Sequence, residues 1–398
     1  MTRLRKLLAT IRLPAISVLV ALLVGALVIM LSDLEVLGKI PQDPLGAIVL
    51  GVQRVYLAYT SLLMGAFGDP AKFGKAIAAG GDAVLWAKAF RPITETLLAS
   101  VPLMFVGLAV MVSFRTGVFN IGGEGQFMMG ALGGTVAAIV LGGAGLPTPI
   151  TILGVVALGA FFGAAWAFIP GILKARVGAS EVITTIMLNY IANLFIFFLL
   201  VNWELIQRED RTQPISKALD KFVVIPTILP IEALRLHLGF IVALLLAVVV
   251  SWFLWRTTKG FELRAAGLNL PAARYAGMGA ASSVVIAMLI SGAIAGVGGA
   301  FEVVGTVKQL TTAISGGVGF TAIAIALVGG TRPSGVVATS LVFGALRNGG
   351  ALMGLNTGIP IDLLFFIQAL VIMFIAAPSL TQRLIRSPFK RRVKEVTA

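Results

Sequence analysis

The sequence predicts an all-α polytopic membrane protein. Of its 398 residues, 58% are hydrophobic and only 12% are charged. Apolar runs recur along the chain at about 20 residues, the helix length that a bilayer core about 30 Å thick requires. Basic residues are also distributed unequally between alternate connecting segments. About ten spans are expected, at residues 13–31, 93–113, 124–143, 150–173, 183–202, 237–255, 280–300, 317–330, 336–352 and 360–378.

Two of these spans, 317–330 and 336–352, are short and rich in glycine. Either could be re-entrant, which would leave eight or nine true crossings. The first span is too long for the apolar region of a signal peptide and no small-residue cleavage site follows it, so we expect an uncleaved anchor. We divide the chain into an amino-terminal anchor with an external segment (1–92), a membrane domain (93–378) and a basic tail (379–398).

Basic residues indicate how the spans are oriented. With the amino terminus inside, the inner segments contain more than half of the 31 Lys and Arg residues and only three acidic residues, Glu181, Glu262 and Glu395. Cytoplasmic segments of membrane proteins carry such an excess of Lys and Arg, so both termini are expected in the cytoplasm. The net charge of +14 then needs no nucleic-acid partner, and the tail Lys390–Lys394 is expected beside anionic lipid.

Two outer segments are long. Residues 32–92 mix prolines, glycines and charges with moderately apolar runs, which predicts interfacial helices on the outer face. Within them the apolar block 46–66 is the alternative place for a crossing, although it contains Arg54. Residues 203–236 are charged and contain three prolines, so we expect a surface loop that contacts an external partner.

The segment Phe119–Leu132 places a carboxylate and two amides in glycine-rich backbone at membrane depth. A charged side chain there costs a few kcal/mol even on lenient scales, so it predicts a function. Glycines allow the helix to break, which is tolerated only where protein or a water-filled path surrounds the backbone. We therefore expect Asn120, Glu124 and Gln126 to line a solute pathway.

The remaining polar residues of the spans are few. Glu302, at an outer span end, is expected either to face the external opening or to pair with Lys308. Asn189 is expected to bridge helices. The single His237 lies at a span entrance, where we expect an interfacial residue, and one histidine cannot form a histidine metal cluster. The absence of cysteine excludes disulfides and thiolate chemistry.

The inner loop 256–279 is long and contains Pro271. Because proline is tolerated in the first turn of a helix, a short helix over Ala272–Ala276 is expected, with Tyr275 on it. This helix is either part of a solvated connector or a docking helix for a cytoplasmic motor subunit.

A second inner loop covers residues 174–182. Ser180 is expected to cap the helix that follows it, because a serine hydroxyl can accept a hydrogen bond from the free amides of the first turn. Thr184 and Thr185 are expected to face inward.

Four motifs in this order resemble permeases of bacterial ABC importers for nucleosides and simple sugars. This branch is related to ribose and branched-chain amino-acid permeases, and the resemblance covers roughly residues 93–375. The closest likeness is to nucleoside-uptake permeases served by a substrate-binding lipoprotein. The motifs are Phe-Asn-Ile-Gly-Gly-Glu-Gly-Gln (119–126), Gly-Ala-Ser-Glu-Val-Ile-Thr-Thr-Ile-Met-Leu-Asn-Tyr-Ile (178–191), Gly-Leu-Asn-Leu-Pro-Ala-Ala-Arg-Tyr-Ala-Gly (267–277) and Gly-Gly-Val-Gly-Phe-Thr-Ala-Ile-Ala-Ile-Ala-Leu (316–327).

The resemblance implies a non-catalytic, multi-pass subunit in the bacterial inner membrane. The implied partners are a cytoplasmic ABC ATPase, often with two cassettes in one chain, a second permease that is a paralogue, and an external substrate-binding lipoprotein. ATP and magnesium are bound by the ATPase, and this chain has no G-x-x-x-x-G-K-[ST] phosphate-binding loop. The residues implied in coupling to the ATPase are Glu262, Arg264, Asn269, Ala272, Ala273, Arg274, Tyr275 and Gly277, with Ser180, Glu181 and Thr184 in the second cytoplasmic loop.

A short internal likeness also points to a transporter. Gly122–Gly125 is followed by Gly-Gly-Thr at 133–135, and Gly316–Gly319 is followed by Gly-Gly-Thr at 329–331. The predicted topology runs the first copy outward and the second inward, and inverted repeats of broken helices are a common way to build a solute site. The likeness is either chance or a repeat. A repeat would place 119–126 opposite 316–321 across the pathway.

These observations predict an importer subunit for nucleosides, with two alternatives left open. The first is a permease for a simple sugar such as ribose. The second is an ion-coupled secondary transporter in which Glu124 and Glu302 bind the coupling ion. A membrane enzyme is not favoured, because the chain lacks cysteine, clustered histidine and any pairing of a nucleophile with a base.

Overall fold

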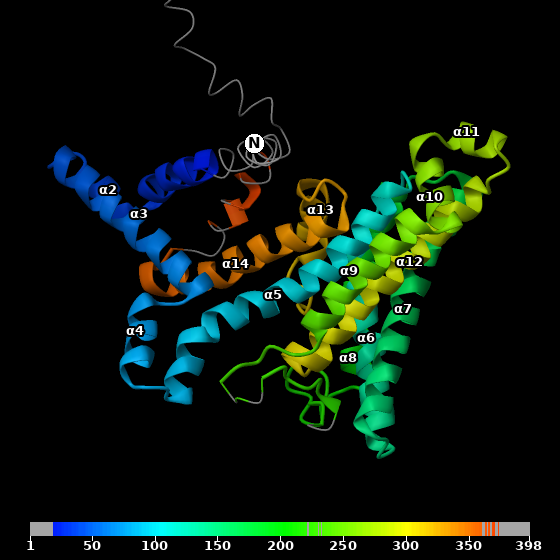
Figure 1. The fold of residues 1–398 in the computed structure, drawn as a ribbon, viewed down its shortest axis with the longest axis horizontal. Helices are drawn as coiled ribbons and strands as arrows, with labels where there is room; N and C mark the ends of the chain where they lie inside the picture. Colours follow the sequence, from blue (N-terminus) through cyan, green and yellow to red (C-terminus); the bar gives the residue numbers. More distant parts are fainter. Residues whose placement is uncertain are drawn as a thin grey trace, which may run out of the picture. The chain divides into compact units, whose positions relative to one another are not determined.

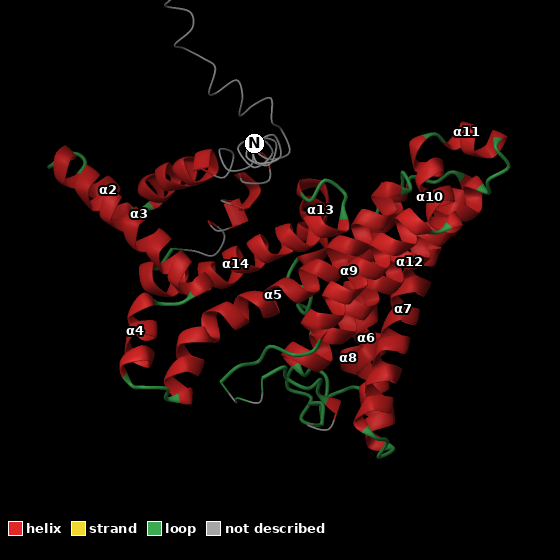
Figure 2. Cartoon of the chain, viewed as in Figure 1, coloured by secondary structure: helices red, strands yellow, loops and turns green. Residues whose placement is uncertain are grey.

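The computed structural model describes residues 19–220, 223–229, 231, 233–359, 363, 365–366, 368–370 and 373. Over these residues the chain is helical, with three isolated β-bridges and no strand (Figure 1 and Figure 2). The basic amino terminus, most of the predicted span 360–378 and the tail 379–398 lie outside the described residues. The predicted all-α polytopic class is confirmed.

Eight helices of the described chain are long and apolar enough to cross a membrane. Seven of them coincide with predicted spans and the eighth is α3, which corresponds to the apolar block 46–66. They are α3 (Pro44–Phe67), α5 (Ala83–Arg115), α6 (Gly123–Gly143), α7 (Thr148–Val177), α8 (Glu181–Asn202), α9 (Gly239–Arg256), α12 (Ala280–Phe301) with the π-helical turn η2 (Glu302–Val307), and α14 (Pro333–Thr357).

The two glycine-rich spans that could have been re-entrant, 317–330 and 336–352, differ in length. The predicted span 336–352 is a full helix, α14, of 25 residues. The predicted span 317–330 is α13 (Val318–Val328), with only 11 residues. At a rise of about 1.5 Å per residue, α13 covers about half of a bilayer core. The helix Leu19–Ser32 is also shorter than a full crossing within the described residues.

The described residues form two compact units, one within residues 1–93 and 345–398 and the other Thr94–Gly344. The first boundary falls beside our boundary at residue 92, whereas residues from 345 onward group with the amino-terminal segment. Helices α5 and α14 each continue from one unit into the other.

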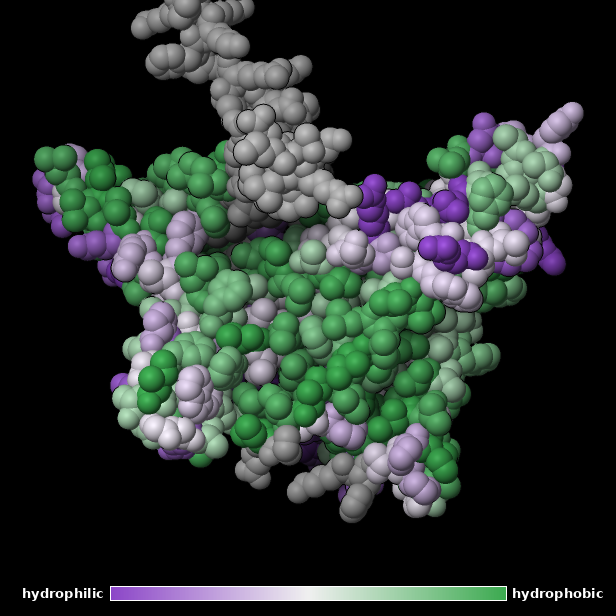
Figure 3. All heavy atoms as spheres, viewed as in Figure 1, coloured by the Kyte–Doolittle hydropathy of each residue, from purple (hydrophilic) through white to green (hydrophobic). Residues whose placement is uncertain are grey.

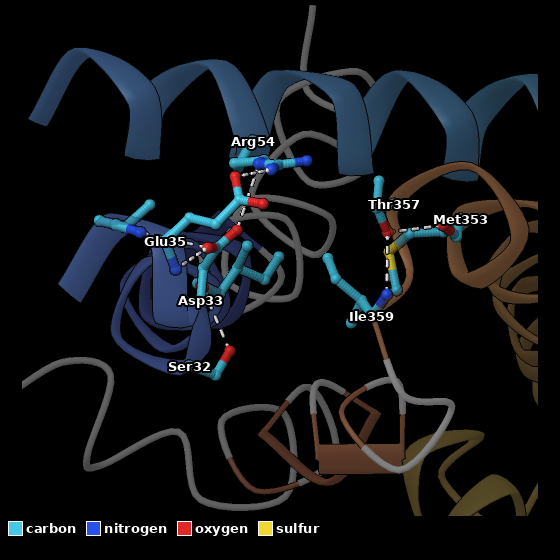
Figure 4. Close-up of polar contacts among 9 residues, drawn as sticks. Ser32, Asp33, Glu35, Arg54, Met353, Thr357 and Ile359 are labelled. Carbon is cyan, nitrogen blue, oxygen red and sulfur yellow. Dashed lines mark hydrogen bonds and ion pairs between the residues drawn. The ribbon is translucent and has the colours of Figure 1, made fainter. Parts of the chain in front are cut away.

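The first unit contains the helix Leu19–Ser32, α2 (Leu34–Lys39), α3 and α4 (Pro70–Ala78). The apolar block 46–66, the alternative place for a crossing, forms one continuous helix of 24 residues, α3, which is long and apolar enough to cross a membrane. Arg54, which argued against a crossing, has its charge offset by two carboxylates (Figure 4). Its Nε lies 3.2 Å from Asp33 Oδ2 and its Nη2 contacts Glu35.

The second unit is built on the close contact of α6, α7 and α12. A Cβ added to Gly130 of α6 would lie 2.1 Å from the Cα of Gly296 of α12, and one added to Gly163 of α7 would lie 2.3 Å from the carbonyl oxygen of Gly292. Small residues allow helix backbones in a membrane to approach this closely. Glycines spaced by four therefore form the contact of the three helices.

The two ends of this unit have different structures (Figure 1). One end carries α10 (Thr258–Leu268) and α11 (Leu270–Tyr275), where the sequence predicted a single short helix in a loop. The other end carries the segment 203–238, whose described residues are irregular, with isolated β-bridges and no long helix. Between the ends, hydrophobic side chains cover the face of α9 and α12 that Figure 3 shows, and hydrophilic side chains gather near α10.

Candidate functional site

The chain breaks between α5 and α6, at residues 116–122. Gly117 in this break has a φ of +74° and packs against α10, where a Cβ on it would lie 3.1 Å from the Gly267 backbone. The Asn120 side chain folds back on the chain, and its Oδ1 accepts a hydrogen bond of 2.8 Å from the Gly122 amide. A positive φ and a side chain that bonds its own backbone are ways to end one helix and begin the next.

A buried amide network fills the space beside this break. Asn120 Nδ2 donates to Gln126 Oε1 at 3.0 Å and to Ser291 Oγ of α12 at 2.9 Å, and Gln126 Nε2 donates back to Asn120 Oδ1 at 3.1 Å. Ser291 Oγ in turn donates to the Ala109 carbonyl of α5 at 2.8 Å. Both amides are essentially inaccessible to solvent. In this conformation they therefore bond to each other and to α12.

Asn189 of α8 holds the start of α6 from another side. Its Oδ1 accepts a hydrogen bond of 2.9 Å from the Gly125 amide, and its Nδ2 donates to the Ile121 carbonyl at 3.0 Å. A single amide side chain thus satisfies one donor and one acceptor that the helix break leaves free. The predicted role of Asn189 as a bridge between helices is confirmed.

Glu124, in the first turn of α6, holds the amino terminus of α13. Its Oε2 accepts a hydrogen bond of 2.6 Å from the Gly319 amide, and its Oε1 accepts one from the Ser315 hydroxyl. The residue is 8% exposed. A carboxylate at a helix amino terminus is stabilised by the free amides there. The charge of Glu124 is therefore solvated by protein groups.

The segments 119–126 and 316–321 touch directly, whereas the internal likeness, if it is a repeat, placed them opposite each other across the pathway. A Cβ on Gly319 would lie 2.2 Å from the Glu124 amide nitrogen. The two helices run in opposite directions from this contact. Helix α6 leads toward the irregular end, where Gly142 packs against Val223, and α13 leads toward the α10 end, where the Thr331 carbonyl accepts a hydrogen bond from Arg115.

Glu302 does not join this network. It begins the turn η2 at the opposite end of α12 from Ala280, and Thr306 Oγ1 donates to its Oε2 at 3.3 Å. The same turn approaches His237, whose Nε2 lies 3.3 Å from Thr306 Oγ1 and whose Nδ1 accepts from the Gly239 amide at 3.1 Å. The structure therefore places Glu302 in a cluster at the irregular end, apart from Asn120, Glu124 and Gln126.

Two further residues at the irregular end, His237 and Arg235, have surroundings that the sequence did not reveal. His237 lies two residues before α9 and is 1% exposed, so protein groups bury it at the span entrance, and this burial lowers its pKa to about 4. Arg235 forms a two-point ion pair with Glu95, with its Nε at 2.9 Å and its Nη2 at 2.6 Å from the two carboxylate oxygens. This pair raises the pKa of Arg235 above its ordinary value. It fastens the irregular segment to α5.

Helix α11 projects its side chains outward at the other end of the unit. The predicted helix after Pro271 is confirmed, because the Asn269 side chain caps it by accepting from the Ala272 amide at 3.1 Å. Tyr275 is 98% exposed, whereas Ala273 is buried. The remaining residues named for coupling on this segment, Ala272, Arg274 and Gly277, are exposed.

The two residues named on α10 are half-buried and have partners. Glu262 pairs with Lys259 at 2.9 Å. Arg264 Nε donates to the Leu254 carbonyl at 2.9 Å, and its guanidinium lies 5.7 Å from the centre of the Trp255 ring. Arg115 lies over the same ring at 5.5 Å. The sequence analysis did not predict this cluster of two arginines around one tryptophan. The feature that could have indicated it is a tryptophan at the end of a span, close in sequence to basic residues.

The second inner loop lies at the start of α8. Ser180 occupies the cap position, but its hydroxyl forms no capping hydrogen bond, so that prediction is wrong. The negative charge of Glu181 in the first turn stabilises the helix start instead, and Glu181 pairs with Lys174 at 2.8 Å. Thr185 is buried as predicted, whereas Thr184 is half-buried and donates to the Ser180 carbonyl at 3.0 Å.

Sequence reasoning also missed Ser291 and Ser315, the hydroxyls that complete the two networks. Each stands next to a glycine in a long apolar run. A hydroxyl in a membrane span tends to hydrogen-bond across helices, so each of these serines could have been predicted to bond to another segment.

Long apolar helices packed through glycine, with broken helices meeting at a buried polar centre, define a membrane permease. Residues 93–376 match the family described as "Branched-chain amino acid transport system / permease component", and the chain belongs to this family. The resemblance found in the sequence is thus confirmed. Members of this family are permease subunits of ABC transporters, which are membrane components and not the ATPase.

The relatives of the chain include permeases with different named cargo. The guanosine ABC transporter permease protein NupP of Bacillus subtilis (strain 168) is 39% identical over 342 residues, which is 84% of this chain and 92% of NupP. The nucleoside ABC transporter permease protein NupB of Lactococcus lactis subsp. cremoris (strain MG1363) is 37% identical, over 72% of this chain and 79% of NupB. The glucose ABC transporter permease protein TsgB13 of Haloferax volcanii is 34% identical, over 73% and 77%. No solved structure matches the chain significantly.

Proposed function

We propose that the chain is the permease subunit of an ATP-driven importer that moves nucleosides into the cytoplasm. The observation that carries this proposal is the 39% identity to a guanosine permease over 92% of that protein's length. The nucleoside permease NupB supports it. The glucose permease, at 34% identity, keeps a simple sugar such as ribose as the second candidate. Both kinds of cargo are neutral and rich in hydroxyl groups.

In this proposal the ATPase docks on α10 and α11. An exposed short helix with apolar and aromatic side chains suits an interface, because aromatic residues supply contact area at low entropic cost. Tyr275 is 98% exposed and Leu268 is 89% exposed on this segment. Arg274 beside them is exposed and can pair with a carboxylate of the partner. Ser180 and Glu181, at the start of α8, form the second contact.

The contact of α10 with the helix break is the route by which docking acts on the pathway. A Cβ on Gly267 would lie 2.3 Å from the Arg115 carbonyl, so α10 and the end of α5 cannot approach further. A push on α10 therefore moves the backbone of residues 115–117. Asn120 follows three residues later and anchors the amide network. Motion of the ATPase cassettes would thus be transmitted to the polar centre through the backbone contact between α10 and residues 115–117.

We place the cargo pathway beside this polar centre. Asn120, Glu124 and Gln126 have bonds to protein in the present conformation. Cargo gains access to Glu124 only when α13 separates from α6, and to Asn120 and Gln126 only when their bonds to each other and to Ser291 of α12 open. The hydroxyl groups of a nucleoside can then replace the Ser315 hydroxyl and the Gly319 amide as donors to Glu124. Glu302 lies at the external entrance in this arrangement, with His237 and Arg235 near it.

The proposed partners are an ABC ATPase with two cassettes, an external substrate-binding lipoprotein and a second, paralogous permease. Three organisms each have a pair of permeases related to this chain: NupP with NupQ in Bacillus subtilis, NupB with NupC in Lactococcus lactis, and TsgB13 with TsgC13 in Haloferax volcanii. Such pairs support a pore formed by two unlike subunits. ATP and magnesium belong to the ATPase in this proposal.

We propose the inner membrane as the location, with α10, α11 and both termini in the cytoplasm. This orientation requires that only one of the helix Leu19–Ser32 and α3 crosses completely, because α5 enters the membrane from outside. The two helices pack against each other, with Leu62 and Ala58 beside Ile29. A third arrangement, in which both cross, would put the amino terminus outside.

Single-cysteine labelling separates these arrangements, since the chain contains no cysteine of its own. Gln42→Cys is labelled from outside if the first helix crosses and from inside if α3 crosses. Labelling of Thr2→Cys by an impermeant reagent added outside would refute the cytoplasmic amino terminus. Tyr275→Cys is expected to react only after the membrane is opened.

The function is tested by uptake of labelled guanosine and adenosine in cells that express the complete transporter, with and without this chain. Uptake that needs the chain, persists with excess ribose and stops on ATP depletion is expected. Uptake blocked by ribose would assign a sugar cargo. Uptake that follows the proton gradient and ignores ATP would refute an ATP-driven importer.

A further inference from the structure

A groove of about 850 Å³ runs between α9 and the first turns of α14. It lies within the second unit and is separate from the polar centre and from α11. Its wall on α9 is mainly apolar. The groove is lined by Leu244, Ala247, Val248, Ser251, Trp252, Trp255 and Arg256 of α9 and by Arg332, Pro333, Ser334 and Val337 at the start of α14.

The body of the groove is suited to hydrocarbon. Val248 is 65% exposed and Trp252 is 59% exposed, on a helix whose outward side chains are apolar (Figure 3). Trp252 and Trp255 occupy the last turns of α9. Tryptophan is enriched where the membrane meets water, at the level of the lipid headgroups. The groove below these residues therefore lies at the depth of the acyl chains.

The mouth of the groove is positively charged. Arg256 and Arg332 are both exposed at it. Within the part of the chain that the structure describes, no carboxylate forms an ion pair with either. Arg115 lies close enough to Arg332 for their charges to repel. Helix α14 begins at Pro333, so the positive end of its dipole adds to this charge.

We propose that this groove binds one anionic diacyl phospholipid of the cytoplasmic leaflet. The phosphodiester contacts Arg256, Arg332 and the Ser334 hydroxyl, and one acyl chain lies along Val248 and Trp252. Basic pockets between transmembrane helices on the cytoplasmic side are known to hold such headgroups. The proposal goes beyond the cargo and rests only on the proposed orientation of the α10 end.

Charge distinguishes this occupant from a second permease. A second copy, or a paralogue with the same basic cytoplasmic end, would bring arginines against Arg256 and Arg332, and like charges in contact are unfavourable. A free phosphate ion would leave the apolar wall of the groove exposed. Only an anionic lipid satisfies both the charge and the hydrocarbon surface.

The test uses the full-length chain purified in detergent and native mass spectrometry with added lipid. We expect phosphatidylglycerol to be retained over phosphatidylcholine, and excess inorganic phosphate not to displace it. Each of Arg256→Gln and Arg332→Gln is expected to weaken phosphatidylglycerol binding about fivefold, the effect of one basic residue near a membrane surface. Arg176→Gln, an exposed arginine at the carboxyl end of α7, is the matched control and is expected to have no effect.

A second variant reports the hydrocarbon contact. Ser251→Trp fills the groove without changing charge, and we expect it to reduce retention of both lipids. Equal retention of the two lipids by the unmodified chain, or unchanged retention in both arginine variants, would overturn the proposal. Cross-linking of Val248→Cys between two chains in native membranes would assign the groove to a protein interface instead.

Discussion

Replacing Glu124 tests the contact that joins α6 to α13. Its carboxylate accepts hydrogen bonds from the Gly319 amide, at 2.6 Å, and from the Ser315 hydroxyl. Glu124→Ala removes both acceptors and leaves the buried Gly319 amide without a partner. Glu124→Gln keeps one oxygen for that amide, and its NH₂ group can donate to the Ser315 oxygen.

The two variants should therefore differ in stability. A hydrogen bond to a charged group contributes about 1.5–3 kcal/mol, and a buried donor without a partner costs a comparable amount, so we expect Glu124→Ala to lose about 3 kcal/mol. Glu124→Gln should lose about 1 kcal/mol, because it keeps both contacts and gives up only the charge. In a domain of this size each kcal/mol lowers the midpoint of thermal unfolding by about 2–4 °C.

The assay is thermal unfolding of the full-length chain in detergent, followed by uptake in cells. Glu204→Gln is the matched control, since Glu204 lies just after α8 and pairs with Arg211 at the surface, at 3.5 Å. Such exposed pairs contribute little. An unchanged midpoint in Glu124→Ala would refute the stabilising contact. Uptake that persists in Glu124→Gln would contradict ion coupling at Glu124, because the amide cannot carry the charge that binds the coupling ion.

Three further predictions follow from individual contacts. Gly296→Val adds a side chain whose Cβ would lie 2.2 Å from the Gly159 carbonyl oxygen, so the yield of folded protein, measured by fluorescence-detected size exclusion, should fall sharply. Gly143→Val should be tolerated, because an added Cβ at Gly143 meets no atom within 4 Å. Tyr275→Ala should leave thermal stability unchanged because the side chain is 98% exposed, but should lower ATP-dependent uptake at least tenfold; unchanged uptake would contradict docking at α11. His237 has its pKa lowered to about 4 in the folded chain, so the unfolded chain binds a proton first as the pH falls. The free energy of unfolding should therefore decrease as the pH drops from about 6.5 toward 4, by about 2 kcal/mol at pH 5. His237→Asn should remove this pH dependence of stability, and an unchanged dependence would show that another group causes it.

Much of the membrane architecture was predictable, because helix length and hydropathy are local properties of the chain. The spans at 93–113, 124–143 and 150–173 each correspond to a long helix. Arg54 was the observation that argued against a crossing by α3. Its partners, Asp33 and Glu35, lie about 20 residues earlier, and only folding of the hairpin brings them to it.

The polar centre was predictable in part. A carboxylate at membrane depth predicted a functional site, and the repeated Gly-Gly pattern, if it is not chance, placed 119–126 opposite 316–321. The identity of the partners was not predictable, since Ser315 and Gly319 are 191 and 195 residues away from Glu124. For the same reason the burial of His237 was not predictable, because the turn that packs against it follows α12.

By itself the sequence determined that the chain is an all-α membrane protein, where its long helices lie, which end carries the basic residues and which family motifs it contains. Each of these depends on residue type and on neighbours close in the chain. The tertiary structure alone decided that Asn120 and Gln126 bond to each other and to Ser291, that Glu124 anchors a half-length helix, and that α9 and α14 enclose a groove with a basic mouth. Those features depend on hydrogen bonds and close backbone contacts between distant segments, and such contacts exist only once the helices have packed.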